Sequence, residues 1–505
     1  MTTFSPPLCA GPARPAPPGN RMRGPKLPTH HGRCLGLLGA FGLLACAAGG
    51  CRPSSADSAS EAAPAGPLPR PAAFPLRLSP DRRYVVDWKG EPFLVQGDAA
   101  WSLIAKLTDE DAETYLEDRR RRRFDAVLVS LIEHKFTSRP PANAYGQAPF
   151  ARPGDFTAPN EAYFAHADGV LRRAAGKGIA VFLVPAYLGQ KGEDEGWYQE
   201  MRRAGPDALR AYGRYVGQRY ASFDNIVWVL GGDYTPPSEG IAIERAFGEG
   251  LREADAGRHL MTAHWDAEMS ALDLPDPTIT SWLDLDTTYT YRPVYEKSLA
   301  DWRRPGGRPH ILIETTYERE HDSTPRQIRA QAYGALLTGA VGQFFGSGPI
   351  WGFWSWRAAL GARGSVDMTH VRELFDGLPW TLLVPDDPNQ ILLAGSGERG
   401  TNDFALLASA RDGSLAVAYV PTRRSITLDL SRLHMPLRAR WYDPTSGTSS
   451  PAAGSPYATP AATVFATPGP NAGGDPDWVL VLEPVPATRP PPPGASSDGG
   501  PPGPG

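Results

Sequence analysis

Between Leu76 and about residue 385, the chain alternates short apolar runs with longer segments of helical pattern. Runs such as 226–230 (Ile-Val-Trp-Val-Leu) lack the polar alternation of a half-exposed strand, which is typical of parallel strands covered on both faces. The segments between the runs begin with capping residues, as at Thr108, which three acidic residues follow. This alternation over about 300 residues predicts an α/β fold, a (β/α)8 barrel. Its eight strands are expected at 93–98, 124–133, 179–185, 225–233, 259–265, 284–289, 309–314 and from 343 on.

A doubly wound open sheet is the main alternative to the barrel. Such sheets usually carry Gly-x-Gly-x-x-Gly after the first strand, and that pattern does not follow 93–98. Beyond residue 389 the pattern changes to short alternating runs, such as 415–420, which predict antiparallel strands. We therefore expect a barrel over 76–388 and a small β-sandwich over 389–485.

The charge balance and the cysteine positions exclude several classes of protein. With 51 Lys and Arg against 55 Asp and Glu, the chain has no basic excess of the kind that binds nucleic acid. All four cysteines, Cys9, Cys34, Cys46 and Cys51, precede the barrel, which therefore contains no disulfide and no cysteine-ligated zinc.

The two ends of the chain read as processing and linker segments. Basic residues before Cys34 lead into an uncharged stretch that reaches Cys46, as in a secretory signal, and this stretch is shorter than the roughly 20 residues of a membrane span. Leu43-Leu44-Ala45-Cys46 resembles a bacterial lipobox, with Cys51 as the weaker alternative for lipidation. We expect a signal or lipoprotein segment at 1–51, a flexible linker at 52–75 and a disordered Pro/Gly-rich tail at 486–505. The protein would be secreted or a bacterial cell-envelope lipoprotein, held to a membrane only through its lipid.

Two acidic residues end two of the expected strands. Asp233 closes 225–233 and Glu314 closes 310–314. Carboxyl groups at the carboxyl ends of barrel strands point into the site where such barrels perform their chemistry, and paired carboxylates hydrolyse glycosides. Either residue alone is equally explained as a salt-bridged acid, but the pair favours catalysis. We assign Asp233 as the acid/base and Glu314 as the nucleophile.

Other polar and aromatic residues fall at strand ends, where they would contact a sugar. The expected substrate-binding residues are Asp98, Trp101, Glu133, His134, Tyr187, His264, Trp265, Tyr289, Tyr317, Glu318 and Trp354. Several have a second explanation: Asp98 as a turn cap, Glu133 and His134 as a surface pair, and Glu318 as an acid behind the site. A single strand-end histidine such as His264 is more often structural than catalytic.

Three blocks resemble the apiosidase-like glycoside hydrolases of family 140. They are 92–101 (Pro-Phe-Leu-Val-Gln-Gly-Asp-Ala-Ala-Trp), the helix ending at 119–124, and 228–233 (Trp-Val-Leu-Gly-Gly-Asp). The resemblance covers about 76–485 and implies a barrel followed by a β-sandwich named for collagen binding. It also implies that Asp233, in the Gly-Gly-Asp motif, is the acid/base and that Glu314 is the nucleophile. Thr-Thr-Tyr-Glu follows Glu314 where the family pattern is closer to Pro-x-Tyr-Glu, so the preferred sugar stays open.

The leading hypothesis is a secreted glycoside hydrolase that acts on polysaccharide side chains. The name of the family that it resembles implies apiosidase activity. A non-catalytic carbohydrate-binding lipoprotein on the same barrel is the alternative, which the intact pair disfavours. A metal-dependent hydrolase ranks last, because no His-x-His or His-Glu-x-x-His occurs. We expect a carbohydrate substrate, no metal and no cofactor.

Overall fold

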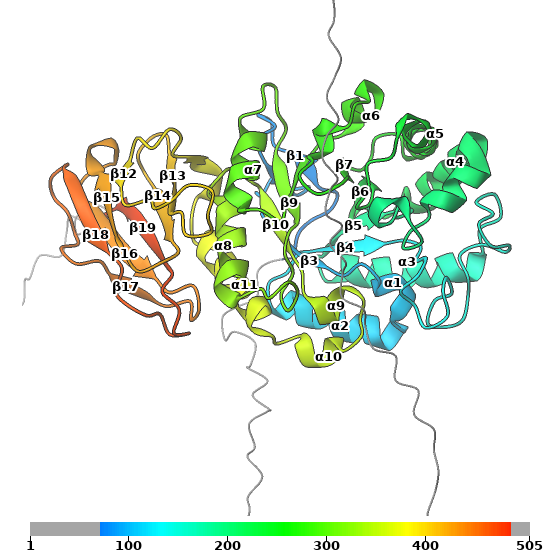
Figure 1. Cartoon of the computed structure of the whole chain (residues 1–505), viewed down its shortest axis with the longest axis horizontal. Helices are drawn as coiled ribbons and strands as arrows, with labels where there is room; N and C mark the ends of the chain where they lie inside the picture. The colour runs from blue at the N-terminus through cyan, green and yellow to red at the C-terminus, as the bar shows by residue number, and fades with distance from the viewer. Residues whose placement is uncertain (1–70, 486–505) are drawn as a thin grey trace, which may run out of the picture. The chain divides into compact units, whose positions relative to one another are not determined.

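The computed structural model describes residues 71–485, and its larger part is a parallel barrel (Figure 1). The hydrogen-bonded order is β7-β6-β5-β4-β3-β10-β9-β8, every neighbouring pair is parallel, and the end strands β7 and β8 contact each other. The sheet is thus a nearly closed eight-stranded barrel, which confirms the predicted fold class. Its strands are β3 (Val95–Ala99), β4 (Ala126–Ser130), β5 (Ala180–Val184), β6 (Ile226–Gly231), β7 (Met261–His264), β8 (Asp286–Tyr289), β9 (His310–Glu314) and β10 (Gly342–Phe345).

Helices follow the strands and cover the outside of the sheet (Figure 1). Thr108 accepts a hydrogen bond from the Asp111 N–H, which makes it the expected cap of α2. The helix after β5, α4, continues through a break at Gly205, whose φ is 80°. The long helices are α2 (Asp109–Arg121), α3 (Glu161–Gly176), α4 (Tyr198–Tyr220), α5 (Ser238–Asp255), α7 (Val294–Trp302), α8 (Pro325–Leu336) and α11 (Arg363–Asp376). The short ones are α1 (Leu103–Lys106), α6 (Pro277–Trp282), α9 (Gly348–Trp351) and α10 (Trp356–Ala359).

Alternation along each strand divides the barrel core into two layers. Inward side chains such as Val95, Phe182 and Phe344 fill the barrel, whereas outward ones such as Trp228 pack beneath the helices. Gly97 faces the Phe344 ring so closely that a Cβ would lie 2.2 Å from it. The same alternation decides which strand-end residues reach the site.

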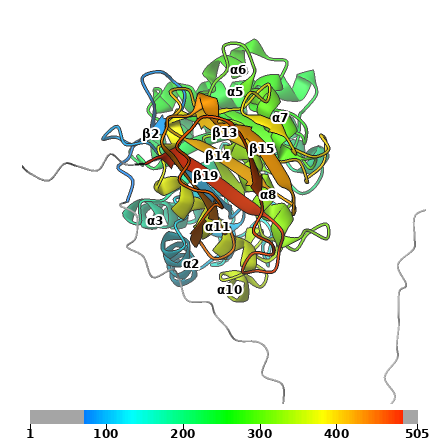
Figure 2. The same cartoon turned by 90° about the vertical axis from the view of Figure 1, so that its left-hand side faces the viewer.

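The C-terminal part forms two antiparallel sheets, one of six strands and one of three. Figure 2 looks onto this part, where β13, β14 and β19 lie side by side. Residues of both sheets, such as Ala418, Leu480 and Phe465, share one apolar core, as the predicted sandwich requires. The strands are β11 (Leu383–Pro385), β13 (Leu406–Ala410), β14 (Ala416–Val420), β19 (Trp478–Pro484), β16 (Leu437–Tyr442) and β17 (Ser449–Pro451), then β12 (Leu392–Ala394), β15 (Ser425–Asp429) and β18 (Ala462–Ala466).

The sandwich packs against helices of the barrel. Tyr419 of β14 stacks on Tyr333 of α8 with ring centroids 4.8 Å apart. Arg329 of α8, fully buried, binds Asp367 of α11 at 2.6 Å and both oxygens of Asp477 at 2.7 Å. Packing against the barrel is therefore one role of the sandwich.

The segments expected at the two ends of the chain lie outside the described residues. This holds for the signal and lipobox with Cys46, for the linker up to residue 70 and for the tail at 486–505. Within 71–485, no helix has the length and apolar character needed to cross a membrane. A hairpin of β1 (Arg77–Leu78) and β2 (Val85–Val86) precedes the first barrel strand.

Candidate active site

The Gly-Gly-Asp motif is a tight backbone turn at the end of β6. Gly231 has a φ of 81° and Gly232 a φ of 126°, values that L side chains rarely adopt. A Cβ on Gly231 would lie 2.5 Å from the His264 carbonyl oxygen, and one on Gly232 would lie 2.3 Å from the Tyr187 ring. Asp233 itself is left-handed, with a φ of 53°, a strain of about 1 kcal/mol or more that is common at functional sites. Both glycines are therefore needed to aim Asp233.

His264, at the end of β7, connects Asp233 to Glu314. Its Nδ1 accepts a hydrogen bond from the Asp233 N–H at 2.7 Å, so in the neutral ring the proton is on Nε2. Nε2 donates to Oε2 of Glu314 at 3.0 Å. The ring is fully buried and stacks on Tyr289 with centroids 4.8 Å apart, which fixes its orientation. His264 is thus a positioning residue between the two carboxyl groups.

Three tyrosines complete the hydrogen bonds of the pair. The Tyr289 hydroxyl donates to Oδ1 of Asp233 at 2.7 Å, and that of Tyr187 lies 3.5 Å from Oδ2. The Tyr291 hydroxyl donates to Oε1 of Glu314 at 3.2 Å. Both oxygens of Glu314 therefore accept a hydrogen bond, the arrangement that suits an ionised carboxylate.

The environment of Asp233 favours its protonated form. Burial, and then the charge of Glu314, raise the pKa of Asp233 to about 7, against the opposing effects of His264 and of the Tyr289 hydrogen bond. A carboxyl group with this pKa is substantially protonated at neutral pH. The site therefore places a carboxyl group that keeps its proton, Asp233, beside a carboxyl group that accepts two hydrogen bonds, Glu314.

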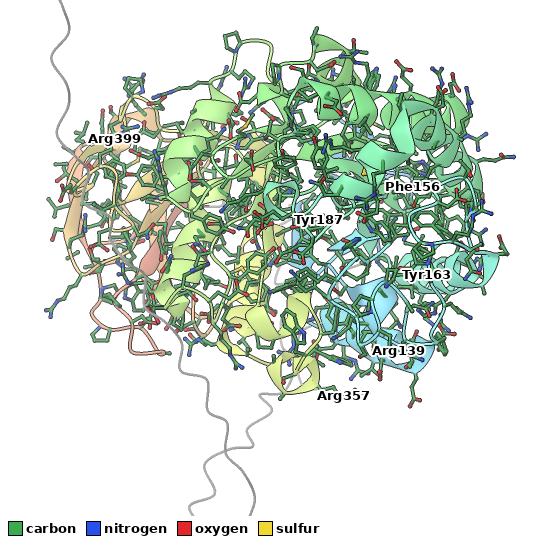
Figure 3. All side chains as sticks on the ribbon, turned by 45° about the vertical axis from the view of Figure 1, so that its right-hand side comes forward. Arg139, Phe156, Tyr163, Tyr187, Arg357 and Arg399 are labelled. Atoms are coloured by element: carbon green, nitrogen blue, oxygen red, sulfur yellow. The ribbon has the colours of Figure 1, made fainter. Side chains whose placement is uncertain are left out.

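A cleft of about 150 Å³ opens over the two carboxyl groups, at the carboxyl end of the barrel. This volume is below the range of about 300–1,000 Å³ for drug-sized ligands and suits a single sugar ring. A hollow of about 360 Å³ around Phe93 and Phe124 is larger but lies at the amino ends of the strands, away from this chemistry. The cleft lining comprises Trp101, Ser130, Glu133, Phe136, Tyr187, Gln190, Glu195, Asp233, Glu314, Tyr317, Glu320 and Trp351, and Figure 3 labels Tyr187.

Six of the residues expected from the sequence line this cleft, namely Trp101, Glu133, Tyr187, Asp233, Glu314 and Tyr317. The Trp101 Nε1–H donates to the Tyr317 hydroxyl at 3.0 Å, so these two rings hold each other in place. Glu133 accepts a hydrogen bond from Ser102 at 2.7 Å. Tyr289 contacts Asp233 from behind, and Trp354 lies at the rim with 52% of its surface exposed.

Asp98 and Trp265 do not line the cleft, because both point out of the barrel. Asp98 follows the inward Gly97 and is fully buried against α2, where it binds Arg119 at 3.1 Å and Tyr115 at 2.7 Å. Trp265 follows the inward His264 and donates to the Ala271 carbonyl at 3.1 Å. The structure therefore gives both side chains packing partners in place of a sugar.

Glu318 and His134 also lie outside the cleft lining. Glu318 is buried, and its Oε1 accepts a hydrogen bond from the Gly364 N–H in the first turn of α11 at 2.7 Å. His134 bonds the Asp194 carbonyl at 2.8 Å and lines a neighbouring open hollow of about 770 Å³. Glu318 thus caps a helix. The His134 ring does not contact the Glu133 carboxylate, but the His134 backbone N–H donates to Oε1 of Glu133 at 2.9 Å.

The cleft also contains residues that the sequence reasoning did not select: Ser130, Phe136, Gln190, Glu195 and Glu320. Gln190 and Glu195 lie on the loop after β5, whose ends meet at Gly189 and Gly196. A Cβ on Gly196 would lie 2.2 Å from the Gly189 nitrogen, so the glycines at 189 and 196 were the available signal. Among residues 71–485, no group of three or more His, Cys, Asp or Glu is placed to hold a metal ion.

A (β/α)8 barrel whose fourth and seventh strands each end in a carboxyl group, with aromatic rings around both, defines a glycoside hydrolase. The family model described as "Apiosidase-like, catalytic domain" matches residues 79–382, more than half of the chain. The chain therefore belongs to the apiosidase-like family. A second model, "Putative collagen-binding domain of a collagenase", matches residues 387–483.

Solved structures of glycoside hydrolases share this fold. One, titled "Glycoside hydrolase", is 22% identical, with 82% of this chain and 99% of that chain covered at a TM-score of 0.70. A glycoside hydrolase family 5 protein from Bacteroides vulgatus ATCC 8482 is 21% identical, with 81% and 93% covered at a TM-score of 0.70. Among curated proteins, nothing matches the chain.

Proposed function

We propose that the protein is a secreted glycosidase of the family 140 type that cleaves a glycosidic bond in polysaccharide side chains. Asp233 is the acid/base and Glu314 the nucleophile. The observation that carries this proposal is the unlike environment of the two carboxyl groups: the pKa of Asp233 is raised to about 7, while Glu314 accepts two hydrogen bonds. One acid that keeps its proton beside one carboxylate is the pairing that glycoside hydrolysis requires.

In the proposed reaction, Glu314 attacks the anomeric carbon while Asp233 gives its proton to the departing oxygen. The glycosidic bond breaks, and a bond between the sugar and a Glu314 oxygen forms. Asp233, now ionised, takes a proton from water, whose oxygen displaces Glu314 and releases the sugar with retained configuration. His264 and Tyr291 hold the Glu314 oxygens throughout, so the attacking group needs little reorganisation.

The charge of the cleft supports a neutral sugar as the group it holds. Among its lining residues, Glu133, Glu195, Asp233, Glu314 and Glu320 carry carboxyl groups, and none is Lys or Arg. An anionic sugar would be repelled in a partly buried site with this lining. Apiose, to which the family name points, is neutral. Secretion and anchoring through Cys46 are proposed from the N-terminal pattern.

The test is hydrolysis of aryl glycosides and apiose-containing pectin fragments by the full chain, beside Asp233→Ala and Glu314→Ala. Asp224→Ala is the matched control, because Asp224 is an exposed acid before β6. We expect sugar release by the parent and the control and loss in both site variants, with circular dichroism unchanged. Release that survives both site substitutions contradicts the assignment. Binding of the fragments without release would favour the alternative of a non-catalytic carbohydrate-binding protein.

A further inference from the structure

Trp354 is an exposed indole beside the cleft. In the described part of the chain two tryptophans are more than half exposed, Trp88 at 54% and Trp354 at 52%. Trp88 belongs to the segment between β2 and β3, at the amino end of the barrel, and Arg77 lies over its ring at 3.7 Å. Trp354 follows α9, at the carboxyl end. A large ring left in water forgoes the stabilisation of burial, so its exposure calls for a reason.

The backbone of this loop holds Trp354 outward. Phe353 is left-handed, with a φ of 55°, and its ring is buried 5.0 Å from Tyr115 and 5.9 Å from Trp356. The Trp354 ring lies over Gly352, where a Cβ would approach it to 2.5 Å. A strained anchor and an obligatory glycine therefore fix the direction of one exposed ring, as at ligand-binding sites.

Two further rings connect Trp354 to the cleft. Trp351 and Phe136 line the cleft, and the Trp351 Nε1–H donates to Glu320 at 2.8 Å. The Trp354 ring lies 4.5 Å from Trp351, and Phe136 lies 5.0 Å from Trp351 and 6.3 Å from Trp354. Lys106 places its ammonium 5.9 Å from the Trp354 centroid. Two of these three rings thus line the cleft that contains the carboxyl pair, and the third extends them to the rim.

We infer that Phe136, Trp351 and Trp354 form a second sugar subsite, and that the substrate is a saccharide of at least two rings. The cleft of about 150 Å³ holds one ring over Asp233 and Glu314. The next ring lays its C–H face on the exposed Trp354 indole, because sugar faces are apolar and indoles offer a large, rigid apolar surface. This inference rests on the proposed function, since it names the substrate class of the same site.

Binding to the full-length Glu314→Gln variant tests the subsite without turnover. The probes are methyl apioside, which has one ring, and an apiose-containing pectin fragment, which has several. Adding Trp354→Ala should weaken binding of the fragment about tenfold, equivalent to about 1.4 kcal/mol, and change binding of methyl apioside less than about twofold. Trp354→Phe, which keeps a ring, should restore part of the loss, and Trp88→Ala, the matched exposed indole, should change neither affinity.

Three results would overturn the subsite: equal losses for both probes, no loss for the fragment, or no binding of the fragment by Glu314→Gln. Hydrolysis by the parent is scored separately. Binding that depends on Trp354 without hydrolysis by the parent would leave the subsite standing and refute the proposed catalysis. Hydrolysis by the parent, together with fragment binding that does not depend on Trp354, would leave the proposed catalysis standing and refute the subsite.

Discussion

Replacement of Asp233 by Asn should abolish hydrolysis and stabilise the fold, increasingly so as the pH rises. Folding raises the pKa of this carboxyl group from its ordinary 3.8 to about 7, so between these values the folded state binds the proton more tightly than the unfolded state. The free energy of unfolding of the parent therefore falls as pH rises through this window. Each pKa unit is worth about 1.4 kcal/mol. Relative to a side chain that stays neutral, Asp233 therefore lowers the free energy of unfolding by about 2 kcal/mol at pH 5 and by about 4 kcal/mol at pH 8.

Urea unfolding of parent and Asp233→Asn at pH 5 and pH 8 measures this difference. The variant should gain about 2 kcal/mol more, relative to the parent, at pH 8 than at pH 5. Asp224→Asn, at an exposed position before β6, should show no such pH trend. A gain for Asp233→Asn that is equal at both pH values, or larger at pH 5, would refute the reasoning that Asp233 holds its proton in the fold.

Three other substitutions probe the same account. His264→Ala removes the donor to Glu314 and the acceptor for the Asp233 N–H, and should lower kcat about 100-fold or more while KM, measured in the same assay, changes little. Tyr289→Phe removes a hydrogen bond that lowers the pKa of Asp233, so the alkaline limb of the kcat/KM profile should move to higher pH; a shift to lower pH would contradict this. Arg329→Ala leaves Asp367 and Asp477 buried without their cation and should cost about 3–5 kcal/mol in urea unfolding, whereas Arg172→Ala on the exposed face of α3 should cost less than about 1 kcal/mol.

The barrel could be predicted from the sequence because fully buried parallel strands are continuous apolar runs, and the eight runs recur with helices between them. Asp233 and Glu314 followed from their places at the ends of two such runs. The other residues of the site were predicted less well from the sequence. Position at a strand end says that a side chain is near the site but not which way it points, and a one-residue step from Gly97 to Asp98, or from His264 to Trp265, turns a side chain from the barrel interior to the helix layer.

Most of the site residues that the sequence did not predict lie on loops. Gln190, Glu195 and Glu320 reach the cleft from loops, whose course depends on glycine turns and tertiary contacts and has no period to read. The dual hydrogen bonding of His264 was equally hidden, since it depends on the left-handed Asp233 that presents its N–H to the ring. Glu318 resembled a site acid in the sequence because it lies four residues after Glu314, but its partner is the first turn of α11, 46 residues further along.

The roles of Asp233 and Glu314 are the central claim, and azide rescue tests them most directly. The substrate is the activated aryl glycoside that the parent hydrolyses, and NMR determines the configuration of the glycosyl azide. Azide should restore turnover to Glu314→Ala with an azide product of opposite anomeric configuration, because the anion replaces the nucleophile. With Asp233→Ala the product should keep the configuration of the substrate, because azide attacks the Glu314-bound sugar. Rescue of neither variant, or the two configurations exchanged, would contradict the account.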